Sequence, residues 1–357
     1  MRLGINLGYW GAGDNQENIV LAEEADRLGY AVCWAAEAYG SDVPTVLAWV
    51  GARTSRIDLG AAVMQIPARS PAMTAMTAAT LDTLSGGRFR LGLGVSGPQV
   101  SEGWHGVRFT APLARTREYV EIVRMALRRE IVHHEGTHFT LPLPDGPGKA
   151  LKLTVRPVRD HVPLYLAAVG PKNLELTGEI ADGWLAIFFS PEHGSDHLAQ
   201  LRAGARKSGR GDDGSDPLTG FDVVPTVPVV ITDNMDYAYA SVANYAALYI
   251  GGMGSREKNF YNQLACRMGF EEQAKQVQEL YLAGKGRDAA AAVPRQFLDE
   301  TSLLGPRERI RDRLAAYHEA GVTTLSISPF APSRAARRDT VVEMAEIASE
   351  SGLVQLG

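Results

Sequence analysis

The residues best placed to do chemistry follow short apolar runs that we interpret as buried strands. One such run, RIDLG, leads into AAVMQIPARSP at 61–71, where two alanines stand in place of bulky branched residues. Gln65 and Arg69 follow the alanines, one polar and one cationic. Small residues let a ligand approach the backbone closely. We therefore expect a flat ligand to lie against the backbone of this stretch.

Glu37 is the acid at the end of the second predicted strand, within CWAAEAYGSD. Burying a carboxylate costs free energy unless a partner is present, so a carboxylate at such a position is seldom without a role. It could hydrogen-bond a ring system or act as an acid/base group. The alternative is a stabilising contact with an amide of a neighbouring loop. We favour the functional role.

Two glycine-containing turns are candidates for binding an anion or a cofactor. In AAVGPKN, Gly170 ends a predicted strand, Pro171 opens a helix and Lys172 stands beside them. The free amides of such a helix start bind anions, although a plain strand-to-helix turn is the alternative. In GLGVSG at 92–97 the third glycine of a dinucleotide fingerprint is missing. Its small residues could admit a cofactor or simply form a flexible turn.

Several other chemistries are disfavoured. No pair of acids stands at neighbouring strand ends, as glycoside hydrolysis requires, and neither a Ser/His/Asp order nor a nucleophile elbow is evident. His133, His134 and His138 have a spacing that a metal could use. They flank Gly136 in a segment that we expect to be a turn between two strand-like arms. We therefore predict no metal site.

The composition indicates a globular protein that can bury a large core. Its 357 residues are 45% hydrophobic and 22% charged, with a formal net charge of -5. This balance disfavours nucleic acid or an anionic membrane as the main partner. The two cysteines, Cys33 and Cys266, argue against a disulfide framework, and no apolar run approaches the ~20 residues of a membrane span. We expect a cytoplasmic protein with a small-molecule substrate.

Strand-like and helix-like segments alternate along the chain, which predicts parallel strands joined by helices. One helix begins after Ser70 as its N-cap, with Pro71 in the first turn. Eight strands with following helices predict a single (β/α)₈ TIM barrel over 1–357, and a doubly wound open sheet is the competing fold. Two interruptions are expected: an excursion over the barrel rim at 131–161, and a helical insertion at 234–305 that covers the substrate side.

In such a barrel the active residues lie at the C-terminal ends of the strands. This rule gathers a ring of mostly small and apolar candidates with few carboxylates. The ring comprises Asn6, Tyr9, Trp10, Glu37, Tyr39, residues 62–65, 95–99 and 168–173, Phe188, Phe189 and residues 326–328.

Several of these segments resemble the bacterial luciferase-like flavin and deazaflavin oxidoreductases. The specific run is RSPAMTAMTAATLDTLSGGR, supported by EGWHG, YLAAVGPKN and IADGW. The resemblance extends from the first strand to the last, including LLGPRERIRDRLAAYHEAGVTTLSISPF. It is greatest to the coenzyme F420-dependent branch, which includes methylenetetrahydromethanopterin reductase and the deazaflavin-dependent glucose-6-phosphate dehydrogenase.

The resemblance implies a (β/α)₈ barrel that holds a deazaflavin ring at its C-terminal face. It also implies a non-prolyl cis peptide, which by position falls between Ala62 and Val63, behind the ring. The coenzyme's anionic tail suits Lys172 and Arg69. The cofactor-binding residues implied in this way are Asn6, Glu37, Ala62, Val63, Gln65, Val95, Ser96, Gly97, Val169, Gly170, Lys172 and Asn173.

One departure from the family pattern concerns the proton donor. The sugar-phosphate dehydrogenases carry a histidine where this sequence has Ala38, and their carboxylate after the fourth strand is replaced by Gly97. Sugar-phosphate oxidation is therefore not expected. A proton donor must then come from Glu37, Tyr9, Tyr39, His105 or solvent, and we select Glu37 and His105 as the catalytic candidates. The expected substrate walls are Tyr9, Trp10, Trp104, His105 and Phe188.

The resulting hypothesis is a coenzyme F420-dependent oxidoreductase that moves a hydride between the deazaflavin C5 and an unidentified organic substrate. An FMN-dependent monooxygenase of the same family is the first alternative. A catalytically silent flavin- or deazaflavin-binding protein is the second. The resemblance also implies a homodimer formed through helices beside the first strands.

Overall fold

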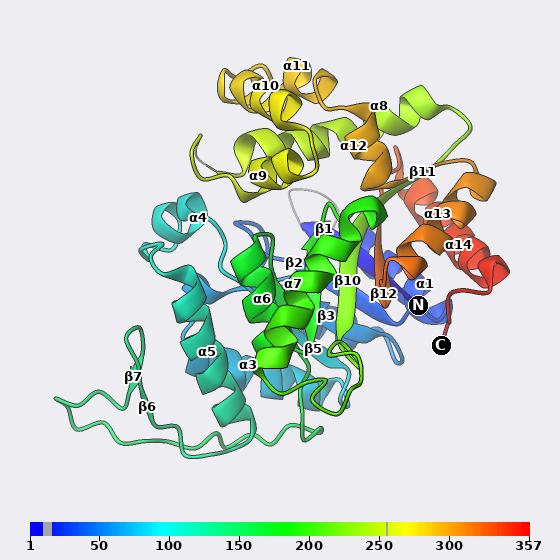
Figure 1. Ribbon diagram of the computed structural model, residues 1–357. Helices are drawn as coiled ribbons and strands as arrows, with labels where there is room; N and C mark the ends of the chain where they lie inside the picture. Colours follow the sequence, from blue (N-terminus) through cyan, green and yellow to red (C-terminus); the bar gives the residue numbers. More distant parts are fainter. Residues whose placement is uncertain (10–15, 255) are drawn as a thin grey trace.

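The computed structural model describes residues 1–9, 16–254 and 256–357, and its centre is a closed parallel barrel surrounded by helices (Figure 1). β10 pairs with both β9 and β12, which closes the ring. The predicted (β/α)₈ barrel is therefore confirmed, and the open-sheet alternative is wrong. The barrel strands, in order around the ring, are β1 (Arg2–Tyr9), β2 (Val32–Ala36), β3 (Asp58–Ala61), β5 (Phe89–Gly94), β8 (Leu164–Ala167), β9 (Gly183–Ile187), β10 (Asp222–Ile231) and β12 (Thr324–Pro329).

An outer layer of helices covers the barrel, and the largest apolar cluster lies between the two layers. The predicted cap is confirmed, because the Ser70 hydroxyl accepts a hydrogen bond from the amide of Met73 at 3.2 Å. These helices are α1 (Gln16–Arg27), α2 (Val43–Gly51), α3 (Pro71–Leu84), α5 (Pro112–Leu127), α6 (Pro171–Ile180), α7 (Gly194–Lys207), α13 (Arg307–Glu319) and α14 (Arg334–Ser351). Shorter elements are β4 (Met64–Gln65), η1 (Ile66–Ala68), α4 (Pro98–Gly103) and η2 (Pro191–His193).

The barrel interior holds a small apolar cluster of its own, centred on Trp34 and Leu185. Trp34 lies across β3, where a Cβ added to Gly60 would stand 2.1 Å from its ring. Glycine at this position therefore makes room for the indole. Ala62, Val63 and Ala167 pack on the cluster from the C-terminal side and are themselves half-buried. The cluster thus fills the middle of the barrel and leaves small residues at its mouth.

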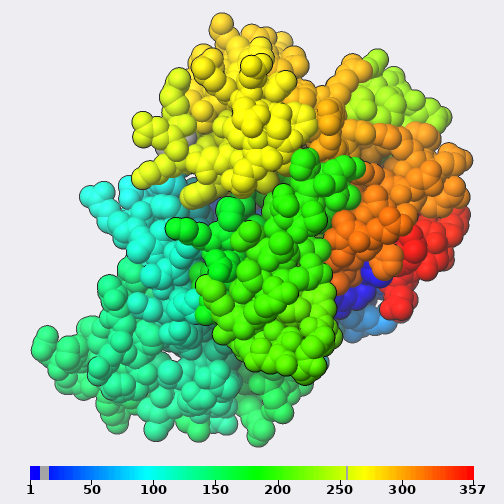
Figure 2. Space-filling model, viewed as in Figure 1, coloured from blue at the N-terminus to red at the C-terminus, as the bar shows by residue number. Residues whose placement is uncertain are grey.

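The helical insertion lies over the C-terminal ends of the strands (Figures 1 and 2, yellow). Its core includes Phe188, Val230 and Leu304, so it is fixed to the ends of three strands by apolar packing. The last three residues of the predicted insertion instead form β11 (Leu303–Gly305), which pairs with β10. Its helices are α8 (Met235–Ala247), η3 (Leu248–Gly252), α9 (Phe260–Arg267), α10 (Glu271–Leu282), α11 (Gly286–Ala291) and α12 (Arg295–Glu300).

The predicted excursion contains β6 (His134–Glu135) and β7 (Thr140–Leu141) and lies at the opposite end of the molecule from the insertion (Figure 1). It is held against α5 by the Glu118 carboxylate, which accepts hydrogen bonds from the amides of three consecutive residues, 137–139. Asp82, near the end of α3, accepts from the amides of Val158 and Arg159 and pairs with the Arg159 guanidinium at 2.6 Å. The excursion therefore follows the N-terminal rim of the barrel and does not reach the mouth.

No group of three or more His, Cys, Asp or Glu side chains in the described part of the chain is arranged to hold a metal ion. Within residues 1–9, 16–254 and 256–357, no helix is both long and apolar enough to span a membrane.

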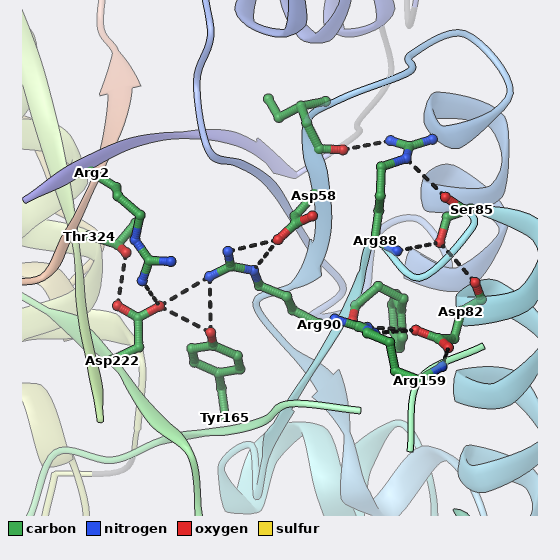
Figure 3. A network of polar contacts seen from close by, with 12 residues as sticks. Arg2, Asp58, Asp82, Ser85, Arg88, Arg90, Arg159, Tyr165, Asp222 and Thr324 are labelled. Carbon is green, nitrogen blue, oxygen red and sulfur yellow. Dashed lines mark hydrogen bonds and ion pairs between the residues drawn. The ribbon is translucent and has the colours of Figure 1, made fainter. Parts of the chain in front are cut away.

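A buried polar network closes the N-terminal end of the barrel (Figure 3). Asp222 accepts hydrogen bonds from Arg90 at 3.1 Å and from the Tyr165 hydroxyl at 3.0 Å, and it pairs with Arg2 at 2.9 Å. Arg90 also binds Asp58 at 2.7 Å. Burial and the charge of Asp222 raise the pKa of Tyr165, so this hydroxyl stays a donor. The network joins β1, β3, β5, β8 and β10 through a side chain of the first or second residue of each strand.

We predict that Asp222→Ala lowers the free energy of unfolding by about 3–5 kcal/mol, because it removes the buried carboxylate that Arg90, Tyr165 and Arg2 share. Asp216→Ala is the matched control, since Asp216 pairs with Arg202 on the surface at 2.8 Å. The control should lose no more than about 1 kcal/mol. Urea titrations followed by circular dichroism measure both. Equal losses in the two variants would show that the network does not hold this end of the barrel.

Candidate active site

The C-terminal mouth of the barrel is floored by small residues from neighbouring strands. The peptide bond between Ala62 and Val63 is cis, at the predicted position, and the Ala62 amide donates to the carbonyl of Ala35 at 2.7 Å. A Cβ added to Gly94 would lie 2.6 Å from Cγ2 of Val63, so this glycine makes room for the valine. Ala62 and Val63 remain half-buried. The small side chains of this stretch therefore leave a flat, partly exposed surface, which suits a flat ligand.

Glu37 lies at the end of β2 with its side chain only 6% exposed, and it is the centre of a hydrogen-bond network. Its carboxylate accepts from the amides of Gln65 at 2.9 Å and Val43 at 3.3 Å. Arg69 binds both carboxylate oxygens, at 2.9 and 2.5 Å, and reaches Asp42 at 2.6 Å. The carboxylate thus has four donors from three segments of the mouth, and the interpretation of Glu37 as a stabilising partner gains support.

Arg69 is consequently not available to an anionic ligand. Its side chain is 13% exposed, and its guanidinium is shared between Glu37 and Asp42. The Arg69 carbonyl in turn accepts from the hydroxyl of Tyr119 at 3.2 Å. Burial raises the pKa of that hydroxyl to about 12, so it remains a donor. The expectation that Arg69 contacts a coenzyme tail is not supported by this geometry.

Gln65 has a polar atom without a partner in the described part of the chain. Its backbone binds Glu37, and its side-chain amide nitrogen donates to the carbonyl of Ala38. Its Oε1 is buried and has no hydrogen-bond donor among those residues, and the residue is only 3% exposed. A buried acceptor without a donor is costly, so a ligand N–H or a water molecule would be bound favourably there.

Asn6 and the segment after β5 complete the same side of the mouth. The side chain of Asn6 donates to the Thr226 hydroxyl at 3.2 Å and accepts from the amide of Gly8 at 2.7 Å, so both its polar atoms are used. β4 pairs with β5 directly behind the Ala62–Val63 stretch, with Gln65 opposite Gly94. The next residues in the chain, Val95, Ser96 and Gly97, are half-buried. These three residues therefore line the mouth beside the Ala62–Val63 stretch.

The end of β8 comes next around the mouth, because β8 pairs directly with β5. Gly170 is the N-cap of α6 and gives no side-chain cap, while Asn173 donates to the carbonyl of Ala167 at 3.4 Å. Lys172 is exposed and has no ion pair with any described residue. Sequence analysis missed Arg267 of α9, which donates to the carbonyl of Val169 at 3.0 Å. No pattern in the insertion pointed to this arginine, because only the fold brings α9 over β8.

The residues predicted to form the substrate walls differ in how far they are exposed. His105 follows α4, and its Nε2 is buried without a hydrogen-bond partner in the described residues, whereas Trp104 is largely exposed. Phe188 is only 2% exposed, because it packs on Tyr249 and Phe297 inside the insertion core. It therefore supports the insertion and offers little open wall. Trp10 lies outside the described residues, and for Tyr9 the structure describes the strand end alone.

Two surface cavities lie away from the floor of the mouth. One of about 540 Å³ lies between α12, β11 and α13, and one of about 170 Å³ lies between α5 and α6 and includes Lys172.

Comparisons with known proteins agree with this architecture. The 5,10-methylenetetrahydromethanopterin reductase of Archaeoglobus fulgidus is 27% identical over 317 residues, which cover 87% of this chain and 89% of that protein. The structure of coenzyme F420-dependent tetrahydromethanopterin reductase from Methanopyrus kandleri superposes with a TM-score of 0.81 at 23% identity and covers 97% of each chain. That structural similarity shows the fold.

A relative with higher identity comes from Mycobacterium tuberculosis and bears the name "putative coenzyme F420-dependent oxidoreductase". It is 44% identical over 333 residues, which cover 92% of this chain and 95% of that protein. The family model described as luciferase-like monooxygenase matches residues 6–324, nearly the whole barrel with its insertion. The resemblance found in the sequence is thereby confirmed, and the chain belongs to the luciferase-like monooxygenase family.

Proposed function

We propose that the protein is a coenzyme F420-dependent oxidoreductase that transfers a hydride between the C5 atom of the deazaflavin and a small organic substrate. The observation that carries this proposal is the 44% identity, over 92% of the chain, to a protein named for that cofactor and activity. The mouth of the barrel supports it, because its floor is shaped for a flat ring. Among the residues that sequence analysis selected, we propose that Ala62, Val63 and Gln65 hold the ring.

The residues present fit a deazaflavin. The low surface of Ala62 and Val63 would support the ring, and the unpartnered Oε1 of Gln65 would accept a hydrogen bond from a ring N–H. At the neighbouring end of β8, the uncapped start of α6 with Lys172 and Asn173 suits the phosphate. Val95, Ser96 and Gly97 would border the ring. When bound, the coenzyme itself supplies the hydride chemistry.

We assign different roles to the two catalytic candidates. Glu37 is saturated by four donors, so we propose that it positions Gln65 and the end of β2 instead of moving a proton. His105 retains a buried Nε2 without a described partner. We propose that this atom holds the proton that accompanies hydride transfer, which fits the absence of a histidine at Ala38. Asn6 fixes the end of β1 through Thr226.

The first test of the function is a comparison of cofactors. We expect oxidised coenzyme F420 to bind the purified protein with a Kd at least about tenfold below that of FMN, measured by fluorescence titration. The reduced coenzyme should then be reoxidised by a carbonyl or imine substrate. Tighter binding of FMN, with oxygen uptake by the reduced complex, would instead support the monooxygenase. Tight binding of F420 without turnover by any such substrate would support a silent binding protein.

A second prediction concerns the ion pair of Glu37 and Arg69, which holds the segments of the mouth together. Arg69→Met should lower the free energy of unfolding by about 3–5 kcal/mol, because it leaves the buried charge of Glu37 uncompensated. The double variant Glu37→Gln/Arg69→Met should recover part of that loss. Arg53→Met is the matched control, since Arg53 pairs with Glu23 on the surface at 2.8 Å. If Arg69→Met were no more destabilising than the control, the pair would not organise the mouth.

We also propose a cytoplasmic homodimer. Both cysteines are free, as in a reducing compartment. Three large apolar residues of α2 and α3, Trp49, Met73 and Met76, are each 50–54% exposed, which is typical of an interface. Met76→Glu should convert the dimer to monomer in sedimentation experiments. Leu282→Glu, at an exposed position of α10, is the control and should leave the dimer intact. A monomeric wild-type protein would contradict the proposal.

A further inference from the structure

The hydroxyl of Tyr119 reaches from α5 to the segment that carries Arg69. It forms a hydrogen bond of 2.6 Å with the hydroxyl of Thr74 and donates to the Arg69 carbonyl at 3.2 Å. Since a hydroxyl has one proton to donate, Thr74 is the donor of the first bond and Tyr119 of the second. Tyr119 and Thr74 are both 0% exposed, so water does not compete for these bonds. The two hydroxyls therefore join α3 and α5 to the backbone just before α3.

Arg69 extends this contact into the proposed cofactor site. Its guanidinium binds both oxygens of Glu37, and the same carboxylate accepts from the amide of Gln65 at 2.9 Å. Arg69 itself lies between η1 and α3, outside any helix or strand. The ladders of the barrel therefore do not hold its carbonyl, and the side chain of Tyr119 does.

The ring of Tyr119 also contacts the rim excursion. Phe139 packs edge-on against it, with the ring centres 5.8 Å apart, and the guanidinium of Arg115 lies over Phe139 at 5.1 Å. The amide of Phe139 donates to Glu118 at 3.0 Å, which fixes the phenylalanine on α5. The excursion does not reach the mouth, but it contacts the tyrosine that binds the Arg69 carbonyl.

We propose that Tyr119 is a positioning residue of the cofactor site and that the excursion supports it through Phe139. Both act through Arg69, which holds Glu37 and thereby the amide of Gln65. The consequence for coenzyme binding rests on the proposed function. The positioning itself does not, because it concerns contacts within the chain alone.

The variant that tests the tyrosine is Tyr119→Phe, which keeps the ring and removes the hydroxyl. Hydrogen exchange of the Gln65 amide, measured by NMR without cofactor, should become roughly three- to tenfold faster, because the segment of Arg69 opens more often when it loses this bond. The affinity for coenzyme F420, measured by cofactor fluorescence, should fall by a similar factor.

Tyr30→Phe is the matched control. Tyr30 is 2% exposed, and its hydroxyl donates to the carbonyl of Val341 at 2.7 Å, beside the start of β2 at the other end of the barrel. The control therefore removes the same kind of buried hydrogen bond. It should leave both the exchange of the Gln65 amide and the affinity for coenzyme F420 unchanged.

Phe139→Leu tests the part played by the excursion. It keeps an apolar side chain and removes the ring, so the Gln65 amide should exchange roughly two- to fivefold faster. Phe221→Leu is its control, because Phe221 also has a guanidinium over its ring, that of Arg210 at 5.8 Å, but precedes β10 at the N-terminal end of the barrel. This control should leave the Gln65 amide unchanged.

The outcomes separate the positioning from the function. Unchanged exchange of the Gln65 amide in Tyr119→Phe, or the same acceleration in Tyr30→Phe, would overturn the positioning and leave the proposed function intact. Faster exchange with wild-type affinity for coenzyme F420 would overturn the role in the cofactor site, and unchanged exchange in Phe139→Leu would overturn the role of the excursion. Failure of the wild-type protein to bind coenzyme F420 would overturn the proposed function, whereas the exchange rates still decide the positioning.

Discussion

The ion pair between Glu37 and Arg69 is the interaction on which the mouth of the barrel depends. The carboxylate joins the ends of β2 and β4 and the start of α2, because it accepts from Gln65, from Val43 and twice from Arg69. A buried carboxylate with four donors is rigidly held. The Ala62 amide donates to the carbonyl of Ala35 in β2, and the Gln65 amide, two residues after Val63, donates to Glu37. The backbone of Ala62 and Val63 is thereby held at both ends.

The two ends of the barrel satisfy their polar groups in different ways. At the N-terminal end, Asp222, Arg90 and Tyr165 satisfy one another, and the end is closed. At the mouth, Gln65 keeps a buried Oε1 without a described partner, and His105, which follows α4, keeps a buried Nε2 of the same kind. Native proteins leave few such atoms, and a bound ligand or a water molecule can complete their hydrogen bonds. The open acceptor of Gln65 is one reason why we place the cofactor at the mouth.

Much of the fold was predictable, because it depends on local patterns. The alternation of apolar runs with helical periods gave the barrel, and Ser70 with Pro71 gave the start of α3. The extra strand β11 was missed because three residues after a helix carry little periodicity. The side of the barrel reached by the excursion was also unpredictable, since it depends on contacts of Glu118 and Asp82 with distant amides and side chains.

The candidate site was predicted in position but not in detail. The residues at strand ends follow from the barrel rule, which is why Ala62, Gln65 and Gly170 were found. The partner of Glu37 could not be found in this way, because Arg69 is 32 residues away and only the folded loops bring the two together. For the same reason Arg69 was assigned to an anionic ligand, and Arg267 was not considered at all.

The central claim is that a deazaflavin ring rests on the backbone of Ala62 and Val63. The most direct measurement is the affinity of Ala62→Phe for coenzyme F420, compared with Ala283→Phe at the exposed end of α10. We predict that Ala62→Phe loses binding at least about a hundredfold with unchanged circular dichroism, because the phenyl ring occupies the space of the ligand. Ala283→Phe should bind as the wild type does. Wild-type affinity in a folded Ala62→Phe protein would contradict the account.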